Sequence, residues 1–395
     1  MLGRLTARMV RTARGKALAK FVIDFGLAGA IAVARHRWRG KRGFPPFLFL
    51  SLTSRCNLRC QGCWVSVDGP AVDLPFAQAD RAIRSACRRG TRFFGLLGGE
   101  PLLYPHLLDL LERHRRCYFQ LFTNGTEMTP ELAGRLAELG NVTPLVSIEG
   151  TETVSDVRRG GCEVYRRTLE GLSACLSAGL VTGVATSACK SNLDDLASEA
   201  FLDRLIELGA HYVWYYAYRP AGPDPHPELA LDAAQLLQLR RFIVEMRARK
   251  PIVIVDTYYD ACGAAFCPAV DGLSYHVSPA GAIEPCPPIQ FARDCLGEGA
   301  DPVAAIEHSA FLPAFREFAA SRTSGCVLLE DPAALAAFLR QWQARDTTGR
   351  GTGYAELGAR IPQPSHHQPG LEVPEKHLAY KLAKRLAFFG FSGYG

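Results

Sequence analysis

The stretch that decides the fold is SLTSRCNLRCQGCWV, residues 51–65, in which Cys56, Cys60 and Cys63 follow the spacing C-x3-C-x2-C. An apolar run, residues 47–52, precedes them, so the three thiols are expected together at the end of a strand. Iron–sulfur clusters are normally held by four Cys thiolates. Three closely spaced cysteines without a fourth therefore leave one iron open for chemistry.

A structural zinc site is the alternative interpretation, because cysteine triplets also bind zinc. Zinc signatures usually pair C-x2-4-C with a second Cys or His pair about 20 residues downstream. No such pair follows Cys63 at that separation. The spacing therefore favours an open cluster.

The loop resembles the cluster motif of the radical SAM superfamily. The resemblance implies a [4Fe-4S] cluster on Cys56, Cys60 and Cys63, whose open iron chelates the amine and carboxylate of S-adenosylmethionine (SAM). It also implies that an electron from the cluster cleaves the sulfonium to give a 5'-deoxyadenosyl radical. One position departs from the family pattern, because Gly62 stands where members often place an aromatic residue near the adenine, and Trp64 comes after the third cysteine.

The composition is that of a globular protein, with 48% hydrophobic and 21% charged residues over 395 positions. A chain of this length with 13 cysteines is no secreted disulfide scaffold and favours a reducing cytosol with cluster ligands. Residues 1–43 hold 11 basic residues and one acid, whereas residues 44–375 hold 30 basic and 38 acidic residues. We expect an acidic enzyme body with basic ends, and no nucleic-acid partner.

Residues 1–43 form a basic N-terminal arm. Its apolar run, residues 21–34, contains Asp24 and at 14 residues is shorter than the roughly 20 that span a bilayer. A secretory signal is rejected, because an oxygen-labile cluster would be exported into an oxidising space. Two interpretations stay open: an amphipathic helix lying on a membrane, or a helix that caps the open end of the barrel. The expected location is cytoplasmic, peripheral at the inner membrane face under the first interpretation.

Residues 44–250 alternate β-rich apolar runs with helical patterns, which predicts βα units around a parallel sheet. Six units predict an α/β fold, an incomplete (β/α)6 TIM-like barrel with functional residues at the C-terminal ends of its strands. The expected strands are residues 47–53, 92–97, 118–123, 144–149, 181–187 and 211–218. The expected helices are residues 76–89, 106–115, 130–139, 163–178, 195–208 and 233–249.

Gly98, Gly99 and Glu100 follow the second expected strand in the sequence GGEP. Paired glycines let a backbone approach a ligand closely, and a carboxylate accepts hydrogen bonds from an ammonium group. One βα unit after the cysteine loop, the motif resembles the superfamily's motif for the SAM methionine amine.

The fourth expected strand runs into SIEGTETVSDVRRG, residues 147–160. The segment resembles a signature of members with SPASM or twitch extensions, in which a serine and an arginine contact SAM. By position these are Ser147 and Arg159, with Arg158 as the rival. The tyrosines within residues 215–218 either pack in the core or line the substrate or adenine pocket.

Residues 251–345 predict a small second domain built on another cysteine group. The sequence CPAVDGLSYHVSPAGAIEPC places Cys267 and Cys286 at the two ends of a short hairpin. The spacing C-x9-15-G-x4-C resembles the opening of SPASM and twitch domains, which carry auxiliary clusters. The long cysteine array of a full SPASM domain does not follow, so one auxiliary [4Fe-4S] cluster in a twitch-like domain is expected, with Cys326 as its third ligand. The fourth ligand stays open between Cys295, Cys262 and the substrate, and zinc or unligated packing thiols are the alternative.

Residues 346–395 read as an extended linker and a basic amphipathic tail. His366 and His367 fall in the linker, where we expect solvated side chains. Leu378, Leu382 and Leu386 are four residues apart and mark an amphipathic helix with basic neighbours. A second such segment supports a membrane surface or a docking groove on the body.

The hypothesis favoured by the sequence is a radical SAM enzyme that abstracts hydrogen from an unactivated carbon of a lipid-like or membrane-associated substrate. The alternative within enzymes is a peptide-modifying (RiPP-type) radical SAM maturase. The alternative of another class is a non-catalytic iron–sulfur or zinc-binding protein. The resemblance implies an electron donor such as flavodoxin or ferredoxin. The substrate, the bond formed and the fate of SAM are left open.

Overall fold

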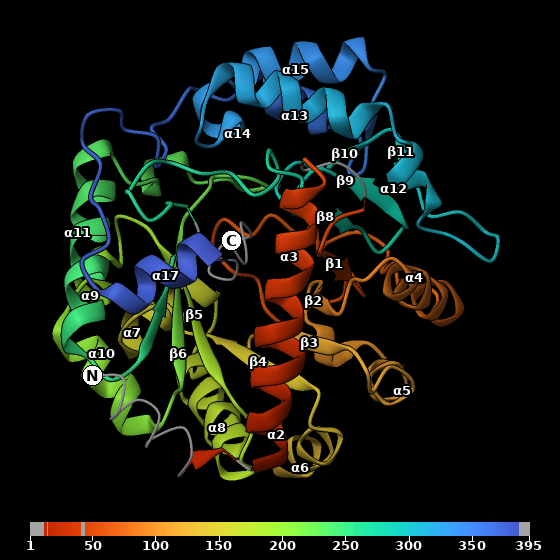
Figure 1. Cartoon of the computed structure of the whole chain (residues 1–395). Coiled ribbons are helices and arrows are strands. Elements are labelled where there is room, and N and C mark those ends of the chain that lie inside the picture. The colour runs from red at the N-terminus through yellow and green to blue at the C-terminus, as the bar shows by residue number, and fades with distance from the viewer. Residues whose placement is uncertain (1–11, 14, 41–43, 257, 387–395) are drawn as a thin grey trace.

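The computed structural model describes residues 12–13, 15–40, 44–256 and 258–386. Over these residues the chain forms a ten-stranded curved sheet with helices around its outside (Figure 1). The predicted α/β partial barrel is confirmed.

Six parallel strands, β1 to β6, pair in chain order and form the partial barrel. Their bounds are β1 Phe47–Ser51, β2 Phe93–Leu97, β3 Tyr118–Thr123, β4 Val142–Ser147, β5 Gly183–Ala188 and β6 Tyr212–Ala217. The helices between them are α4 Phe76–Arg88, α5 Leu107–Arg113, α6 Pro130–Leu139, α7 Glu152–Arg159, α8 Val164–Ser177, α9 Leu193–Leu196 and α10 Glu199–Leu208. Each expected strand and helix of this region is present; β3 and α6 have the expected ends, the others are shifted at one end or both, and the helix expected at residues 195–208 is divided into α9 and α10.

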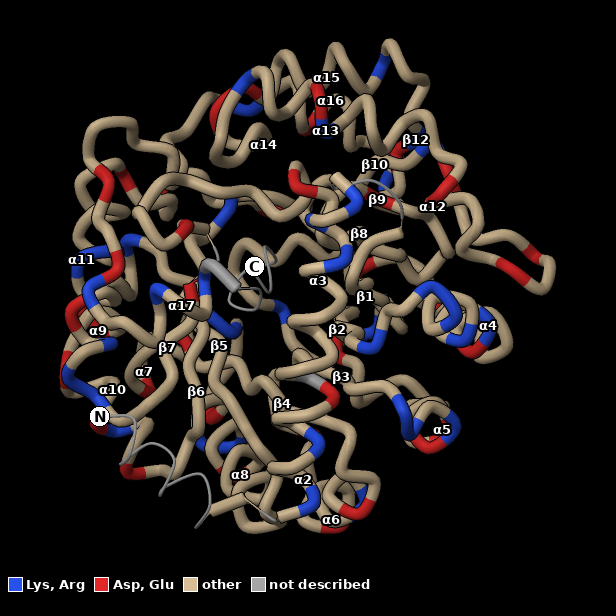
Figure 2. The backbone as a smooth tube through the Cα atoms, viewed as in Figure 1, with Lys and Arg blue, Asp and Glu red and all other residues tan. Residues whose placement is uncertain are grey.

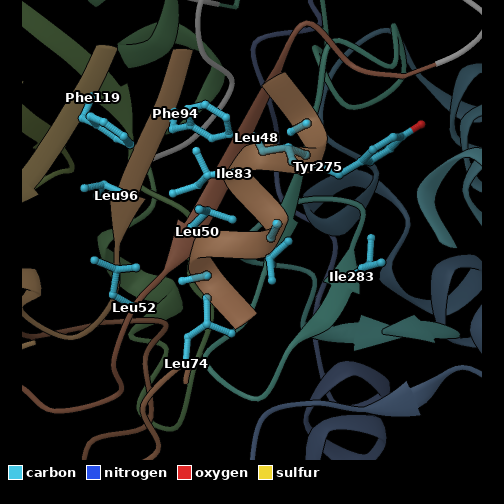
Figure 3. Packing of buried hydrophobic residues seen from close by; sticks show 14 of the residues in the cluster. Leu48, Leu50, Leu52, Leu74, Ile83, Phe94, Leu96, Phe119, Tyr275 and Ile283 are labelled. Atoms are coloured by element: carbon cyan, nitrogen blue, oxygen red, sulfur yellow. The ribbon is translucent and has the colours of Figure 1, made fainter. Parts of the chain in front are cut away.

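The apolar strand β1 is buried on both faces. Leu48 and Leu50 point outward and pack in one cluster with Ile83 of α4 (Figure 3). Phe47 and Phe49 alternate to the other side and belong to the cluster inside the barrel. Each buried side chain of this size contributes about 1.5–3 kcal/mol, so the strand that leads into the cysteine loop is held firmly from both sides.

Four further strands extend the same sheet beyond the predicted six. β7 Val253–Val255 pairs with β6, and β8 Ser274–Val277 pairs in parallel with β1. β9 Ala282–Glu284 and β11 Asp294–Cys295 continue the sheet with antiparallel pairing. The predicted hairpin is β8–β9, but the boundary expected at residue 250 does not divide two sheets, because β8 completes a ladder with β1.

The remaining C-terminal elements begin with α11 Ala233–Arg249, which covers the edge at β7. The others are β10 Phe291–Ala292, α12 Ala304–His308, α13 Phe311–Arg322, α14 Val327–Glu330, α15 Pro332–Gln341, β12 Arg345–Asp346, α16 Gly353–Gly358 and α17 Leu378–Leu386. In the view of Figure 1, α13, α14 and α15 lie above the sheet, α11 lies at its left side and α17 in front of it.

The tail packs on the body, so the expectation of a solvated linker was wrong. His366 is 5% exposed and lies 4.8 Å from the ring of Tyr258 between ring centroids. Further along, Tyr380 of α17 accepts a hydrogen bond of 2.9 Å from the backbone N–H of Ile254. Glu375 is also buried. The tail therefore covers the β7 edge; its last predicted apolar residues, 387–395, lie outside the described part of the chain.

The N-terminal arm forms one continuous helix over Gly15–Trp38, made of α2 Gly15–Lys20, the π-helical η1 Phe21–Leu27 and α3 Ala28–Trp38. In Figure 1 it crosses in front of the sheet. Phe21 packs against Tyr118 and Tyr212 of the barrel interior, with ring centroids 5.9 and 6.3 Å away. These contacts agree with the capping interpretation. Within the described residues it is the one helix, at 24 residues, that is long and apolar enough to cross a membrane by length and composition. The apolar run at residues 21–34 therefore underestimated the length of the helix.

Because His366 is buried, we expect the free energy of unfolding to depend on pH. Burial and the nearby charge of Arg219 lower the pKa of His366 from 6.5 to about 3, and its Nε2 donates to the carbonyl of Phe266 at 3.2 Å. Below pH 6.5 the unfolded chain takes up a proton that the folded chain rejects, so stability falls as pH drops toward 3.

The matched variant is His366→Gln, which keeps a donor and does not titrate. Urea unfolding at pH 7.5 and pH 5 should show that the wild type loses about 2 kcal/mol more than this variant between the two values. Equal losses in both proteins would contradict a neutral buried His366.

Candidate active site

A cavity of about 220 Å³ lies at the carboxyl ends of the barrel strands. The sequence-predicted residues that line it are Cys56, Cys60, Cys63, Gly98, Gly99, Ser147 and Arg159. Their elements are the loop after β1, the loop after β2, the end of β4 and the end of α7. The fold thus brings residues more than 100 positions apart to one wall, as expected for strand ends of a barrel.

The GGEP loop is bound to the cysteine loop through backbone groups. The N–H of Gly99 donates to the carbonyl of Thr53 at 2.8 Å, and that of Glu100 donates to the carbonyl of Arg55 at 2.7 Å. A Cβ on Gly99 would lie 2.2 Å from the Arg55 carbonyl oxygen, closer than side-chain carbons approach. Glycine at this position therefore lets the two loops touch beside the cysteines.

The carboxylate of Glu100 does not line the cavity, which corrects the expectation that it receives the SAM amine. It is 1% exposed and accepts from the backbone N–H of Leu102 (3.0 Å), from the hydroxyl of Thr123 (2.7 Å) and from the backbone N–H of Asn124 (2.7 Å). Leu102 belongs to the same loop as Glu100, whereas Thr123 and Asn124 come from the end of β3 and the loop after it. Glu100 is thus a positioning residue that fixes the loops after β2 and β3.

The thiols of the cysteine loop are close to one another and partly buried. Burial, with the charge of Cys60 nearby, raises the pKa of Cys56 to about 11 and that of Cys63 to about 12. Arg159 Nη1 lies 3.7 Å from Cys60 Sγ and supplies a compensating positive charge. The site therefore suits a group that replaces the thiol protons with metal and tolerates the resulting negative charge.

Glu149 is a site residue whose role the sequence did not assign. It forms an ion pair with Arg159 and accepts from the backbone N–H of Ser187 at 2.9 Å. The amide of Asn192 donates to its backbone carbonyl at 3.0 Å. The sequence did contain a signal for Glu149: by strand alternation its side chain points to the same side as that of Ser147, a predicted site residue.

Tyr218 occupies the space beside Gly62, where members of the family often place an aromatic residue. Its hydroxyl lies 1.9 Å from where a Cβ on Gly62 would stand, so a larger residue before the third cysteine would displace the Tyr218 ring. The tyrosine ring lines the cavity and has the guanidinium of Arg158 at 5.1 Å from its centroid. The aromatic side chain on this wall thus comes from the residue after β6 and not from the cysteine loop. For Tyr218, the structure agrees with the interpretation that a tyrosine of residues 215–218 lines the pocket.

A substitution at Gly160 tests whether close contact with α7 holds the cysteine loop in place. It ends α7 at φ +71°, and a Cβ there would lie 2.0 Å from the carbonyl oxygen of Arg59. Gly160→Ala should cost roughly 1–2 kcal/mol in backbone strain and push the loop away. We expect lower iron retention and SAM cleavage slowed by about tenfold or more.

The matched control is Gly134→Ala in α6, where nothing lies within 4 Å of the added carbon. Iron content and 5'-deoxyadenosine formation should stay at the wild-type level in that variant. Wild-type behaviour of Gly160→Ala would show that the loop does not depend on this contact.

The donor set fits a cluster better than a zinc ion. A single zinc ion needs each thiolate at about 2.3 Å. In the part of the chain that the structure describes, no three His, Cys, Asp or Glu side chains are placed to share one metal ion. A cluster spreads its cysteines over separate irons, which suits three thiols that lie near one another in one loop.

A second thiol group surrounds Arg219. Cys267, Cys286 and Cys326 are the cysteines whose charges act on its buried guanidinium. Burial, then the neighbouring thiols of Cys326 and Cys267, raise the pKa of Cys286. These residues fit the expected auxiliary cluster, and Arg219, which the sequence did not single out, would balance its charge.

Cys295 is not brought to this group, which corrects its place as a candidate fourth ligand. It is exposed on the edge strand β11 and pairs with Ala282 of β9. Ala282 precedes Cys286 by four positions, about 13 Å along an extended chain. Cys262 is exposed as well, so the three inner thiols remain as the group that the fold assembles.

Comparisons with known proteins agree with this geometry. The family described as the Radical SAM superfamily matches residues 50–213. Pre-heme d1 synthase of Dinoroseobacter shibae is 34% identical over 161 residues, 39% of this chain and 40% of that protein. PqqA peptide cyclase of Streptomyces rochei is 30% identical over 265 residues, 62% of this chain and 70% of that protein. The structure of Streptococcus suis SuiB bound to SAM has a similar fold, with a TM-score of 0.60 at 17% identity, covering 76% of this chain and 73% of that one.

The fold and the site define an α/β partial-barrel enzyme that holds an iron–sulfur cluster on three cysteines beside a pocket for a second cofactor. The chain belongs to the radical SAM superfamily, and the resemblance predicted from the cysteine loop is confirmed. Its cofactors are a [4Fe-4S] cluster and SAM. The chain spans less than half of the pre-heme d1 synthase that it matches, so its own substrate is a matter of proposal.

Proposed function

We propose that this chain is a radical SAM maturase that modifies a polar, peptide-type substrate in a second cavity beside the SAM cavity. The observation that carries the proposal is a cavity of about 650 Å³ whose wall shares Trp64, Val65 and Gly98 with the first cavity. A substrate there would lie next to the bound cofactor. When bound, the cluster and SAM supply a 5'-deoxyadenosyl radical that abstracts a hydrogen atom.

The wall of the second cavity contains a fixed chain of polar groups. The Glu284 carboxylate accepts from His276 Nδ1 at 2.6 Å, which leaves Nε2 to accept from the hydroxyl of Ser51 at 2.7 Å. Thr347 donates to the other oxygen of Glu284. Both ring nitrogens of His276 are thus engaged and its ring is 1% exposed, so His276 orients the Ser51 hydroxyl, whose oxygen can still accept from a polar substrate group.

This wall supports a peptide over the lipid-like substrate that the sequence favoured first. Eleven of its 21 lining residues carry hydroxyl, amide, carboxylate, imidazole or guanidinium groups, while most of its exposed lining is apolar, a mixture that suits the polar backbone and apolar side chains of a peptide. The similarity to a PqqA peptide cyclase, which covers 70% of that protein, points the same way. A lipid-like substrate is the second candidate, and the apolar outer face of the N-terminal helix favours it.

The chain's own residues position and enclose the reactants. Gly98 and Gly99 present backbone groups to the first cavity, and Arg159 is held there by Glu149. Tyr218 closes the wall behind Gly62. A closed pocket is required because the radical must be kept from water and other side chains. A flavodoxin or ferredoxin is the electron donor that we propose, as is general for the family.

The test uses anaerobically reconstituted protein with SAM and dithionite, which should yield 5'-deoxyadenosine. Perdeuterated peptide and lipid fractions of cells are then added separately, and deuterium in 5'-deoxyadenosine is measured. We expect transfer from the peptide fraction, and loss of that transfer in His276→Ala with SAM cleavage retained. Transfer from the lipid fraction alone would favour the second candidate, and absence of any 5'-deoxyadenosine would contradict the enzyme class.

A further inference from the structure

One side of the helix Gly15–Trp38 is anchored to the barrel. Lys16 and Lys20 donate to the backbone carbonyls of Glu138 and Arg115, both at 2.8 Å. Near the other end, His36 Nε2 lies 3.1 Å from the carbonyl oxygen of Asp271. These polar contacts reach three separate parts of the body. The helix is therefore part of the folded enzyme over its whole length.

The opposite side of the helix is apolar and exposed. The exposed fractions are 56% for Val22, 56% for Ile23, 59% for Leu27, 43% for Ile31 and 87% for Trp38. Ile23, Leu27 and Ile31 are four apart, so they form one row on the helix surface. Single exposed apolar residues need no explanation, but a contiguous row on a soluble protein marks an interaction surface.

Basic residues flank this apolar row. The exposed Arg35 and Arg39 lie at its C-terminal end, whereas Lys16 and Lys20 at the other end are bonded to the barrel. The single acid of the helix, Asp24, is paired with Lys20 at 3.0 Å. Figure 2 shows the helix mostly tan between its blue ends. An apolar row with an exposed cationic end matches the boundary between acyl chains and anionic headgroups.

The C-terminal helix α17 repeats the arrangement. Its Tyr380 and Lys384 are buried against the body, whereas Leu378 is 68% and Leu382 is 46% exposed. In Figure 1 both helices lie in front of the sheet. Two helices, from opposite ends of the chain, thus each keep one side on the barrel and an apolar side in solvent.

We propose that the outer face of the helix Gly15–Trp38, defined by Val22, Ile23, Leu27, Ile31 and Trp38, lies in the headgroup region of an anionic lipid bilayer and docks the enzyme there. The helix lies flat, because its inner side is bound to the barrel by the contacts of Lys16, Lys20 and His36. This docking does not depend on which substrate the enzyme modifies.

The test is flotation of the full-length reconstituted enzyme with vesicles of phosphatidylcholine, with and without phosphatidylglycerol. The wild type should float with the anionic vesicles. Leu27→Ser/Ile31→Ser should lower the bound fraction about tenfold, because two apolar side chains are lost from the contact. The matched control is Ile361→Ser/Leu371→Ser, two residues that are 75% and 53% exposed elsewhere, and it should bind like the wild type.

Trp38 supplies a second readout that does not depend on the double variant. Its indole fluorescence should shift to the blue when anionic vesicles are added, and Trp38→Phe should lose the shift while keeping SAM cleavage. Alkaline carbonate should release the protein, as expected for a peripheral contact. Absence of flotation, equal flotation of the double variant, retention in carbonate as for a spanning helix, or a dimer in solution that buries Trp38 would each overturn the proposal.

Discussion

Cys60→Ala should abolish formation of 5'-deoxyadenosine from SAM by the anaerobically reconstituted enzyme. Cys60 lies between Cys56 and Cys63 in the loop after β1, lines the SAM cavity and faces Arg159. With two thiols left, the loop can no longer hold a cluster with three protein-bound irons. The loss should therefore be complete and should appear together with a fall in bound iron.

The control is Cys162→Ala, an exposed thiol in the turn before α8, which should keep wild-type iron content and rate. Cys286→Ala tests the other thiol group. It should lose the auxiliary share of the iron while SAM cleavage without substrate continues, because Cys286 is not among the cavity residues. Continued SAM cleavage by Cys60→Ala, or its loss in Cys162→Ala, would contradict the assignment of the loop.

Local sequence patterns were sufficient to predict the barrel and most residues of the SAM cavity. The cysteine loop, the GGEP turn and the serine of β4 each follow an apolar strand, and parallel strands bring their carboxyl ends together. Ser147, at the end of β4, follows the same rule, whereas Arg159, at the end of α7, came from the family resemblance, and both line one cavity with Cys60. Spacing alone did not show where the Glu100 carboxylate points, because its partners Thr123 and Asn124 come from the next βα unit.

Contacts between distant segments account for what the sequence could not predict. Gly62 looked like a missing aromatic residue, but the space is occupied by Tyr218, which directly follows β6 and is more than 150 positions away. His366 looked solvated within a Pro-rich segment, but it packs on Tyr258. The pairing of β8 with β1 likewise joins residues more than 200 positions apart. Each case depends on tertiary packing that overrides local composition.

The docked tail is the clearest of these cases, because it depends on a buried group of five charges. Asp256, 2% exposed, accepts from Arg240 at 2.6 Å, from Arg247 at 2.9 Å and from Lys384 of α17 at 2.9 Å. Glu375 lies 2.9 Å from Arg240 and also pairs with Arg247. Burial raises the pKa of Asp256, but the charges of Arg240, Arg247 and Lys384 outweigh it and hold the pKa well below its usual value.

Asp256→Asn should therefore destabilise the fold by about 3–5 kcal/mol, since removing one partner leaves buried cations uncompensated. Urea unfolding at pH 7.5 measures the change, and limited proteolysis should release the segment around Lys384 first. The control is Asp203→Asn, which removes an exposed partner of Lys250 and should cost about 0–1 kcal/mol. If the two variants unfolded at the same urea concentration, the charge group would not be what holds the tail, and its apolar contacts with the β7 edge would have to hold it alone.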